Sequence, residues 1–215
     1  MKKICFIGYG LFLFLLNGVV YNSISQNMDI DLLRKINGNS NEMMDKIFPV
    51  ITNSASPVTI AAPIGLFIAG ISKKDKSLKK NAYLVGGSLI FANAFTTALK
   101  YSVNRKRPFE TYPFIEKKSS GGSPSYPSGH TTTAFATATS LSLSFPKWYV
   151  IVPAYLWACS VGYSRMYLGV HYPSDVLSGI IIGSGISYLS YKGQNWLDNR
   201  KKEKLKTTIE SGKFN

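Results

Sequence analysis

The fold is decided by residues 82–108, AYLVGGSLIFANAFTTALKYSVNRKRP, in which an apolar segment runs directly into a basic one. Residues 82–99 carry no charged side chain, whereas the residues that follow include Lys100, Arg105, Lys106 and Arg107. The apolar part is close to the ~20 residues that a helix needs to cross a bilayer. The stretch therefore predicts a membrane helix that ends in a group of cations.

Further apolar segments recur at regular spacing along the chain. They are residues 4–20, 57–71, 131–145, 148–163 and 176–189. Each is somewhat short for a bilayer span and is ambiguous alone, but the series is typical of a membrane bundle. The sequence thus predicts an all-α fold, a membrane-embedded helical bundle of five to six spans. Cys5 and Cys159 lie within apolar segments, so we expect buried thiols rather than a disulfide framework.

The charge balance, 25 Lys and Arg against 11 Asp and Glu, first suggests a nucleic-acid partner. The charges lie between the apolar segments, however, and not along one helix face. If Lys2 and Lys3 are cytoplasmic and every segment crosses, the N-terminus and the connectors 72–81, 146–147 and 190–215 hold 15 of the 25 cations. This bias follows the positive-inside rule. The excess charge therefore indicates membrane topology, and we expect no nucleic-acid partner.

The two ends of the chain flank the bundle. Residues 1–25 are either a cleavable signal peptide or a first transmembrane span, because Lys2 and Lys3 precede an apolar run. Residues 26–56 are polar, and we expect them to lie on the outer membrane surface or to cap the bundle. Residues 57–192 form the predicted main domain, and residues 193–215 are a basic cytoplasmic tail. The apolar patch of the 26–56 segment consists of Ile30, Leu32, Leu33 and Ile36.

Two glycine-containing stretches carry additional predictions. Residues 119–123, Ser-Ser-Gly-Gly-Ser, are a flexible loop or an active-site lid. Gly179 and Gly183, four residues apart in the last segment, fit close helix packing, either within the chain or in a dimer.

Three polar clusters stand at the ends of the apolar segments. The first is Lys-x6-Arg-Pro at 100–108, the second is Pro-Ser-Gly-His at 127–130, and the third is Ser-Arg-x5-His-x3-Asp at 164–175. In the topology above, all three fall on the outer side of the membrane. We therefore expect them to form one site.

The residue types in these clusters suit phosphoryl transfer. Lys100, Arg107 and Arg165 can surround an anion of about two negative charges. Ser128 and Gly129 precede a helix whose free N–H groups favour an anion. The chain has two histidines, His130 and His171, of which one can attack phosphorus and the other can protonate the leaving oxygen. Asp175, four residues after His171, can accept from its ring N–H. Carboxylates and histidines are too few for a metal site.

In this order and spacing, the clusters resemble the three signature motifs of the type 2 phosphatidic acid phosphatase (PAP2) superfamily. That superfamily includes bacterial non-specific acid phosphatases and vanadium haloperoxidases. The resemblance implies a helical bundle that hydrolyses phosphomonoesters or diphosphates through a phosphohistidine, without metal or cofactor. It implies that His171 is the nucleophile, Asp175 its orienting partner and His130 the general acid. The implied phosphate ligands are Lys100, Arg107, Ser128, Gly129 and Arg165.

Three functions remain open. The first is a lipid phosphatase with its site on the outer, periplasmic face of a bacterial-type cytoplasmic (inner) membrane. Phosphatidate, phosphatidylglycerol phosphate, prenyl diphosphate and lipid A phosphate all fit as substrates. The alternatives are an exported non-specific acid phosphatase and a vanadate-dependent haloperoxidase. The oligomeric state is left open.

Overall fold

The computed structural model describes residues 24–39 and 41–210, and within them all regular secondary structure is helical. The predicted segment 4–20, and with it the choice between signal peptide and first span, lies outside the described residues. The other five apolar segments each correspond to one helix, and only the segment 131–145 extends beyond its helix, by one residue. These helices are α4 (Ala55–Ser72), α5 (Lys76–Val103), α7 (Gly129–Ser144), α8 (Trp148–Tyr167) and α9 (Pro173–Glu210). The all-α prediction is confirmed, and the number of spans stays a prediction.

Two stretches of the described chain are long and apolar enough to cross a membrane, judged by length and composition. They are Glu42–Ser72 and Lys76–Thr111. The first joins α3 (Glu42–Asn53) to α4, so the apolar helix starts earlier than the predicted Pro57. The apolar side chains that extend it are those of the Met-Met and Ile-Phe-Pro-Val-Ile runs within 43–51.

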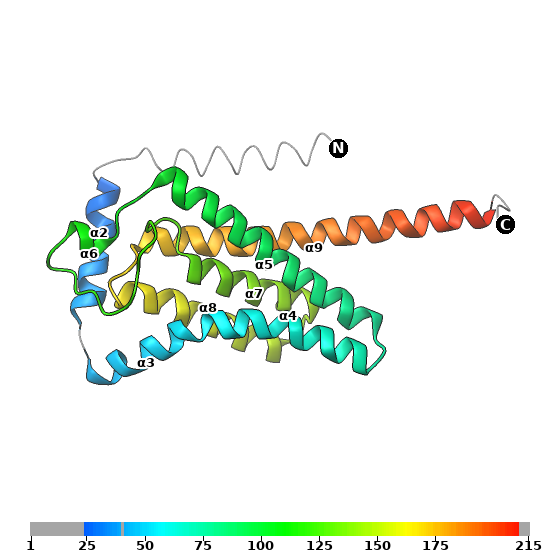
Figure 1. Ribbon diagram of the computed structural model, residues 1–215, viewed down its shortest axis with the longest axis horizontal. Coiled ribbons are helices and arrows are strands. Elements are labelled where there is room, and N and C mark those ends of the chain that lie inside the picture. The colour runs from blue at the N-terminus through cyan, green and yellow to red at the C-terminus, as the bar shows by residue number, and fades with distance from the viewer. Residues whose placement is uncertain (1–23, 40, 211–215) are drawn as a thin grey trace.

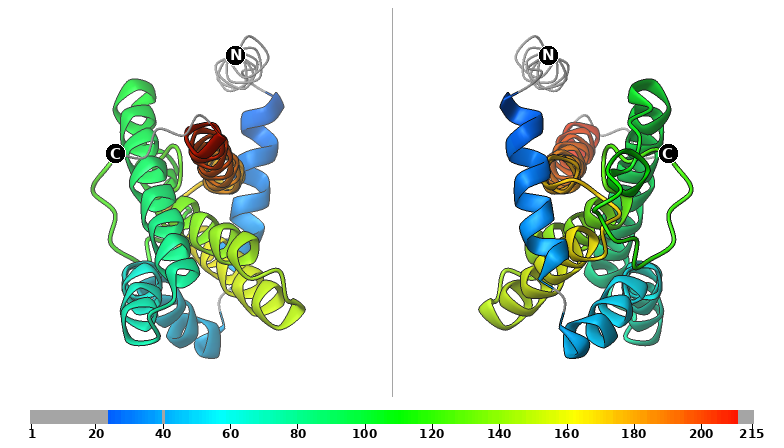
Figure 2. Two further views of the ribbon diagram at one scale, coloured as in Figure 1. Left: turned by 90° about the vertical axis from the view of Figure 1, so that its right-hand side faces the viewer. Right: turned by 90° about the vertical axis from the view of Figure 1, so that its left-hand side faces the viewer.

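Small side chains make α7 the packing centre of the bundle. It contacts α5, α8 and α9 (Figure 2). Its buried residues include Ala134, Ala136 and Ala138, together with several threonines, as expected for a helix that is approached closely from several sides. A Cβ atom on Gly179 would lie 2.9 Å from the Ser128 carbonyl oxygen, and one on Gly183 would lie 2.9 Å from the Ala136 nitrogen. The two glycines therefore serve close packing of α9 on α7 within one chain.

Large apolar side chains cover the outside of the bundle. On α4, Ile60, Ile64 and Ile68 repeat every four residues and are all more than half exposed. Ile90 and Phe91 are similarly exposed on α5. Apolar surface of this extent marks a face that contacts lipid or another protein. Cys159 belongs to this outer surface of α8, so the expectation of a buried thiol is wrong for it: an apolar segment also supplies outward-facing positions.

The ends of the bundle differ in chemistry. The α4–α5 turn at Lys73–Asp75 and the α7–α8 turn at Phe145–Lys147 lie at one end. Asp75 caps α5 there by accepting from the N–H groups of Ser77 and Leu78. The short helix α6 (Pro108–Thr111), the long loop after it and the α8–α9 turn lie at the opposite end (Figure 1). The three motif clusters are therefore brought to one end, as predicted.

Helix α2 (Ile24–Gly38) lies across the motif end (Figure 1). Ile30 and Leu33 are buried against Ile115 and Tyr172, so α2 packs on this end of the bundle. The role of the whole segment 26–56 stays a prediction, because α3 continues into the apolar stretch Glu42–Ser72. Leu32 points the other way and is 49% exposed.

The buried side chain of Asn37, near the end of α2, makes three hydrogen bonds. Its side-chain amide donates to the carbonyl oxygens of Glu116 and Tyr167, and its oxygen accepts from the Glu116 N–H. This amide therefore joins α2 to the long loop and to the end of α8.

Candidate active site

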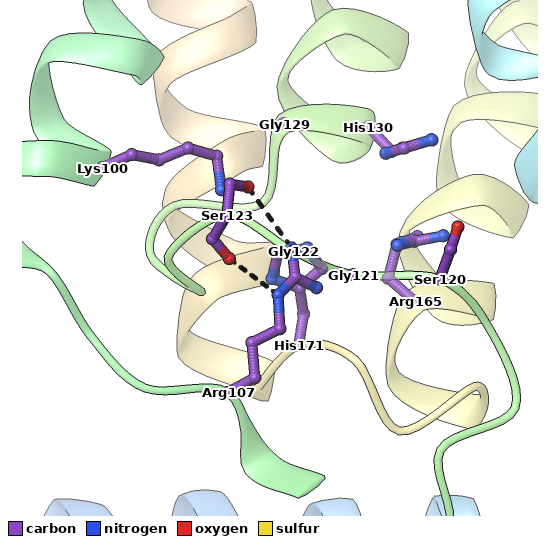
Figure 3. A pocket seen from close by; sticks show the side chains of 10 residues that line it. All are labelled: Lys100, Arg107, Ser120, Gly121, Gly122, Ser123, Gly129, His130, Arg165 and His171. Atoms are coloured by element: carbon purple, nitrogen blue, oxygen red, sulfur yellow. Dashed lines mark hydrogen bonds between the residues drawn. The ribbon is translucent and has the colours of Figure 1, made fainter. Parts of the chain in front are cut away.

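A pocket of about 270 Å³ opens between the motif clusters (Figure 3). Six of the eight predicted site residues line it, and the loop after α6 supplies the remaining wall. The lining residues are Lys100, Arg107, Ser120, Gly121, Gly122, Ser123, Gly129, His130, Arg165 and His171. A small concave site with several fixed cations is suited to a phosphate group.

Each cation is held from a different direction. Arg107 is buried at the start of α6, and its Nε and Nη1 donate to the carbonyl oxygens of Ser123 and Val170 at 2.8 and 2.9 Å. Lys100, in the last turn of α5, donates to the Pro124 carbonyl oxygen at 2.6 Å. Two of these acceptors, Ser123 and Pro124, belong to the loop. The loop carbonyl oxygens thus hold Lys100 and Arg107 at the pocket.

Arg165 differs because one of its donors has no acceptor. The residue is 3% exposed, and its Nη1 donates to Thr52 Oγ1 on α3 at 2.7 Å. Its Nε has no hydrogen-bond partner among the described residues. A buried donor left unpaired costs about 1–3 kcal/mol. An anion in the pocket would supply the missing acceptor.

His171 stands in the short turn between α8 and α9 and is buried. Its Nδ1 lies 3.5 Å from Asp175 Oδ2, so Nε2 is the nitrogen left to face the pocket. Burial lowers the pKa of His171 to about 3, against the raising effect of Asp175. The imidazole is therefore neutral at pH 7, with Nδ1–H directed at the carboxylate and a lone pair on Nε2.

His130 forms another part of the wall (Figure 3). It stands in the first turn of α7, before the apolar segment 131–145. Burial and the positive charges of Arg165, Arg107 and Lys100 lower the pKa of His130 to about 4. A bound phosphate dianion offsets those charges and raises this pKa again. Binding of a dianion therefore favours the protonated form of His130.

Asp175 lies behind His171, outside the pocket, and is completely buried. Its Oδ1 accepts from Arg105 Nη1 at 2.8 Å, while its Oδ2 accepts from Ser125 Oγ and from the Tyr172 N–H at 2.5 and 2.9 Å. These donors stabilise the charged carboxylate. Asp175 is thus fixed in the orientation that faces the His171 ring.

A second carboxylate supports Arg105 from α2. Asp29 Oδ2 accepts from Arg105 Nη2 at 2.8 Å, and Asp29 Oδ1 accepts from the Ser174 N–H at 2.8 Å. The Arg105 guanidinium also lies over the Tyr172 ring, 3.7 Å from its centroid. Arg105 therefore stands between two carboxylates, and α2 completes the support of the site.

Sequence reasoning missed this supporting set. Arg105 stood in the first basic cluster without an assigned role, and Asp29, Thr52 and Ser125 carried no signal. Ser125 sits in a Ser-Pro-Ser-Tyr-Pro-Ser run that resembles any loop.

The predicted phosphate ligand Ser128 does not line the pocket. It is fully buried, its hydroxyl shares a hydrogen bond with Thr131 Oγ1 at 2.9 Å, and its N–H donates to the Asp175 carbonyl oxygen at 3.1 Å. It fastens the start of α7 to the start of α9, and its role as a ligand stays a prediction.

The 119–123 loop, predicted as a flexible loop or a lid, lies on the pocket. A Cβ atom on Gly121 would be 2.6 Å from Arg107 Nη1, whereas one on Gly122 would meet nothing within 4 Å. Gly121 therefore allows the loop to rest directly on the guanidinium. Among the described residues, no group of three or more His, Cys, Asp or Glu side chains is placed to hold a metal ion.

Comparison with known proteins identifies relatives of this arrangement. A family model described as the PAP2 superfamily matches residues 81–198. An undecaprenyl-diphosphatase of Sulfolobus acidocaldarius is 40% identical over 107 residues, which cover 48% of this chain and 50% of that protein. A lipid A 1-phosphatase of Rhizobium johnstonii is 32% identical over 110 residues, 48% of this chain and 43% of that protein. The chain thus spans about half the length of these curated relatives.

Two solved structures resemble the whole bundle. The crystal structure of Aquifex aeolicus LpxE has a TM-score of 0.66 and 27% identity, covering 77% of this chain and 95% of that one. A transmembrane PAP2-type phosphatidylglycerolphosphate phosphatase from Bacillus subtilis has a TM-score of 0.71 and 23% identity, covering 88% of this chain and 94% of that one. The second likeness concerns the fold alone.

Proposed function

The chain belongs to the PAP2 superfamily, and from this membership we propose that it is a membrane phosphatase that hydrolyses lipid phosphomonoesters or diphosphates through a phosphohistidine. The observation that carries the proposal is the pair of histidines on a three-cation pocket. One of them, His171, is backed by the buried Asp175. Neutral His171 supplies a nucleophile, and the cations supply an anion site.

The first step transfers the phosphoryl group to His171. Nε2 attacks phosphorus and forms the N–P bond while the bond from phosphorus to the leaving oxygen breaks. Asp175 accepts from Nδ1–H and stabilises the positive charge that develops on the ring. His130, protonated when the substrate dianion binds, gives its proton to the leaving oxygen.

The second step returns the enzyme to its starting state. His130, now neutral, takes a proton from water as the water oxygen attacks phosphorus. The N–P bond breaks, its electron pair returns to His171 Nε2, and His130 releases its proton to solvent as phosphate leaves.

The cations stabilise the phosphoryl oxygens in both steps. Arg165 offers its unpaired Nε. Lys100 and Arg107 offer their remaining N–H groups while they stay bonded to the carbonyl oxygens of Pro124 and Ser123. Donors that are already fixed near the charge need little rearrangement, and this is the main source of catalysis at such sites.

The substrate class follows from the apolar surface and from the relatives. The outward-facing apolar side chains of α4 and α5 suit a bilayer, which would hold the tails of a lipid while its phosphate reaches the pocket. The names of the relatives, an undecaprenyl-diphosphatase and a lipid A 1-phosphatase, support a lipid phosphate or diphosphate. The motif end lies opposite the lysine-rich turns, and by the positive-inside rule this supports a pocket on the outer, periplasmic face of the cytoplasmic membrane.

Rapid-quench labelling with a ³²P-labelled lipid phosphate tests the mechanism in purified, detergent-solubilised protein. We expect acid-labile, base-stable label on the wild-type chain and none on His171→Ala. With p-nitrophenyl phosphate, His130→Ala should keep more activity than His171→Ala, because this leaving group needs little help from an acid. Label or turnover retained by His171→Ala would overturn the mechanism. Equal kcat/KM for glycerol phosphate and for lipid phosphates would instead overturn the substrate class.

A further inference from the structure

A second pocket lies at the opposite end of α5, far from the histidines. Lys76, Lys79 and Lys80 in the first turns of α5 line it together with Lys201 of α9. Its volume is about 370 Å³. Asp198 is the single carboxylate on its wall, and it is paired with Lys80. The other three lysines have no carboxylate within ion-pair distance among the described residues, so the pocket attracts an anion.

An apolar groove continues from this basic pocket along the same two helices. Its volume is about 350 Å³, and it shares Tyr83, Gln194 and Leu197 with the basic pocket. Leu84 and Phe91 extend it along α5, toward the middle of the bundle. A basic pocket is thus joined to a largely apolar groove.

Two glycines keep the groove open. Gly87 on α5 and Gly193 on α9 both line it, and a Cβ atom on either would meet nothing within 4 Å. At these two positions, no side chain fills the space between α5 and α9. The space that they leave lies on the outer surface of the bundle, where Tyr83 and Phe91 are both more than 60% exposed.

The position of the lysine pocket along α5 matches the level of the lipid headgroups in a bilayer. From Lys79 to Lys100, α5 rises about 31 Å at ~1.5 Å per residue. The hydrocarbon core of a bilayer is ~30 Å thick. With the catalytic pocket at the headgroup level of one leaflet, the lysines therefore stand at the headgroup level of the other.

We propose that the lysine pocket and its groove bind an anionic phospholipid of the cytoplasmic leaflet, with the phosphate among the lysines and one acyl chain along the groove. The inference rests on the membrane placement in the proposed function but not on the catalytic mechanism. Basic pockets between membrane helices favour such headgroups. A bound lipid would neutralise the mutual repulsion of the lysines and fill the gap between α5 and α9.

Native mass spectrometry of the detergent-purified full chain tests the proposal, with phosphatidylglycerol and phosphatidylcholine of the same acyl chains as probes. We expect one tightly bound phosphatidylglycerol and at least about tenfold weaker binding of phosphatidylcholine. Replacing Lys76, Lys79 and Lys201 by Gln should lower the affinity for phosphatidylglycerol about fivefold per lysine removed. Equal affinity for the two lipids would overturn the charge argument.

A matched pair of variants tests the groove. Gly193→Leu fills it, whereas Gly185→Leu adds the same side chain to the same helix, also in open space, outside the groove. Only the first should lose the bound lipid. Equal losses in both, or full displacement by glycerol phosphate at the same concentration as the lipid, would overturn a lipid site. Because binding is read without turnover, these outcomes are independent of whether the phosphatase mechanism holds.

Discussion

Arg105 and Asp175 form a 2.8 Å ion pair across 70 residues of sequence, and the same guanidinium reaches Asp29 on α2 with its other nitrogen. Asp175 is fully buried, so its charge depends on the donors around it. Arg105 touches neither the pocket nor His171. Its place behind Asp175 makes it a positioning residue of the site.

Replacing Arg105 by Gln should lower kcat about tenfold to a hundredfold, because a hydrogen bond to a charged group is worth ~1.5–3 kcal/mol. KM should change little, since Arg105 does not line the pocket. Arg105→Lys should recover part of the loss. Steady-state kinetics on a lipid phosphate separate kcat from KM. Asp29→Asn should lower kcat less than Arg105→Gln, because it leaves the Arg105–Asp175 pair in place. A loss carried entirely by KM would contradict the positioning role.

Binding of a dianion should take up a proton at His130. The pKa of His130 is about 4, and a bound dianion raises it, so affinity should rise as the pH falls from neutral toward about 4 and then level off. The rise should approach about tenfold per pH unit where one proton is taken up. Calorimetric titration with sulfate, whose own charge does not change in this range, measures it. His130→Gln should flatten the dependence, and an unchanged slope in that variant would exclude His130 as the group.

Gly121→Ala should weaken binding of vanadate or phosphate about tenfold. The added Cβ would stand 2.6 Å from Arg107 Nη1, and Arg107 cannot retreat easily because Val170 and Ser123 hold it. Either the loop or the guanidinium must therefore shift. Gly122→Ala, one residue away in open space, is the matched control and should behave as wild type. Inhibition constants for vanadate give the comparison; similar values for the two variants would mean that the loop does not set the position of Arg107.

Labelling from one side of the membrane tests the orientation. In a chain whose Cys5 and Cys159 are replaced by alanine, a cysteine substituted for Ser120 should react with an impermeant thiol reagent added outside intact cells. A cysteine substituted for Ser77 should react only after the cells are opened. Both serines are exposed and lie at opposite ends of the bundle. Labelling in the reverse pattern would place the pocket in the cytoplasm.

The motif residues were predictable because their residue types and spacing indicate their chemistry. They are cations, two histidines and an Asp four residues after His171. The sequence could not give Asp29, which reaches Ser174 across 145 residues, or Thr52, which reaches Arg165 across 113. Such partners meet only in the tertiary structure, and no local sequence pattern indicates them. Ser128 shows the converse, since its motif position predicted a ligand while its hydroxyl is bonded to Thr131.

The helical fold was equally predictable from the series of apolar segments, but the burial of individual positions was not. Ile64 and Cys159 are exposed, whereas Thr131 and Ser140 are buried. In a bilayer the outer face of a bundle is as apolar as a core, and small polar residues suit the helix contacts inside. Hydrophobicity therefore marks the helices without saying which side of each faces inward.

The position of α2 and α3 sets the smallest piece of this chain that can work. A fragment cut at residues 81–198 would keep every motif residue, yet it would remove Asp29 from Arg105 and Thr52 from Arg165. Two guanidinium groups would then lose partners supplied from outside the motif-bearing segment. A minimal catalytic unit, whether expressed alone or grafted onto another membrane protein, has to begin upstream of Asp29.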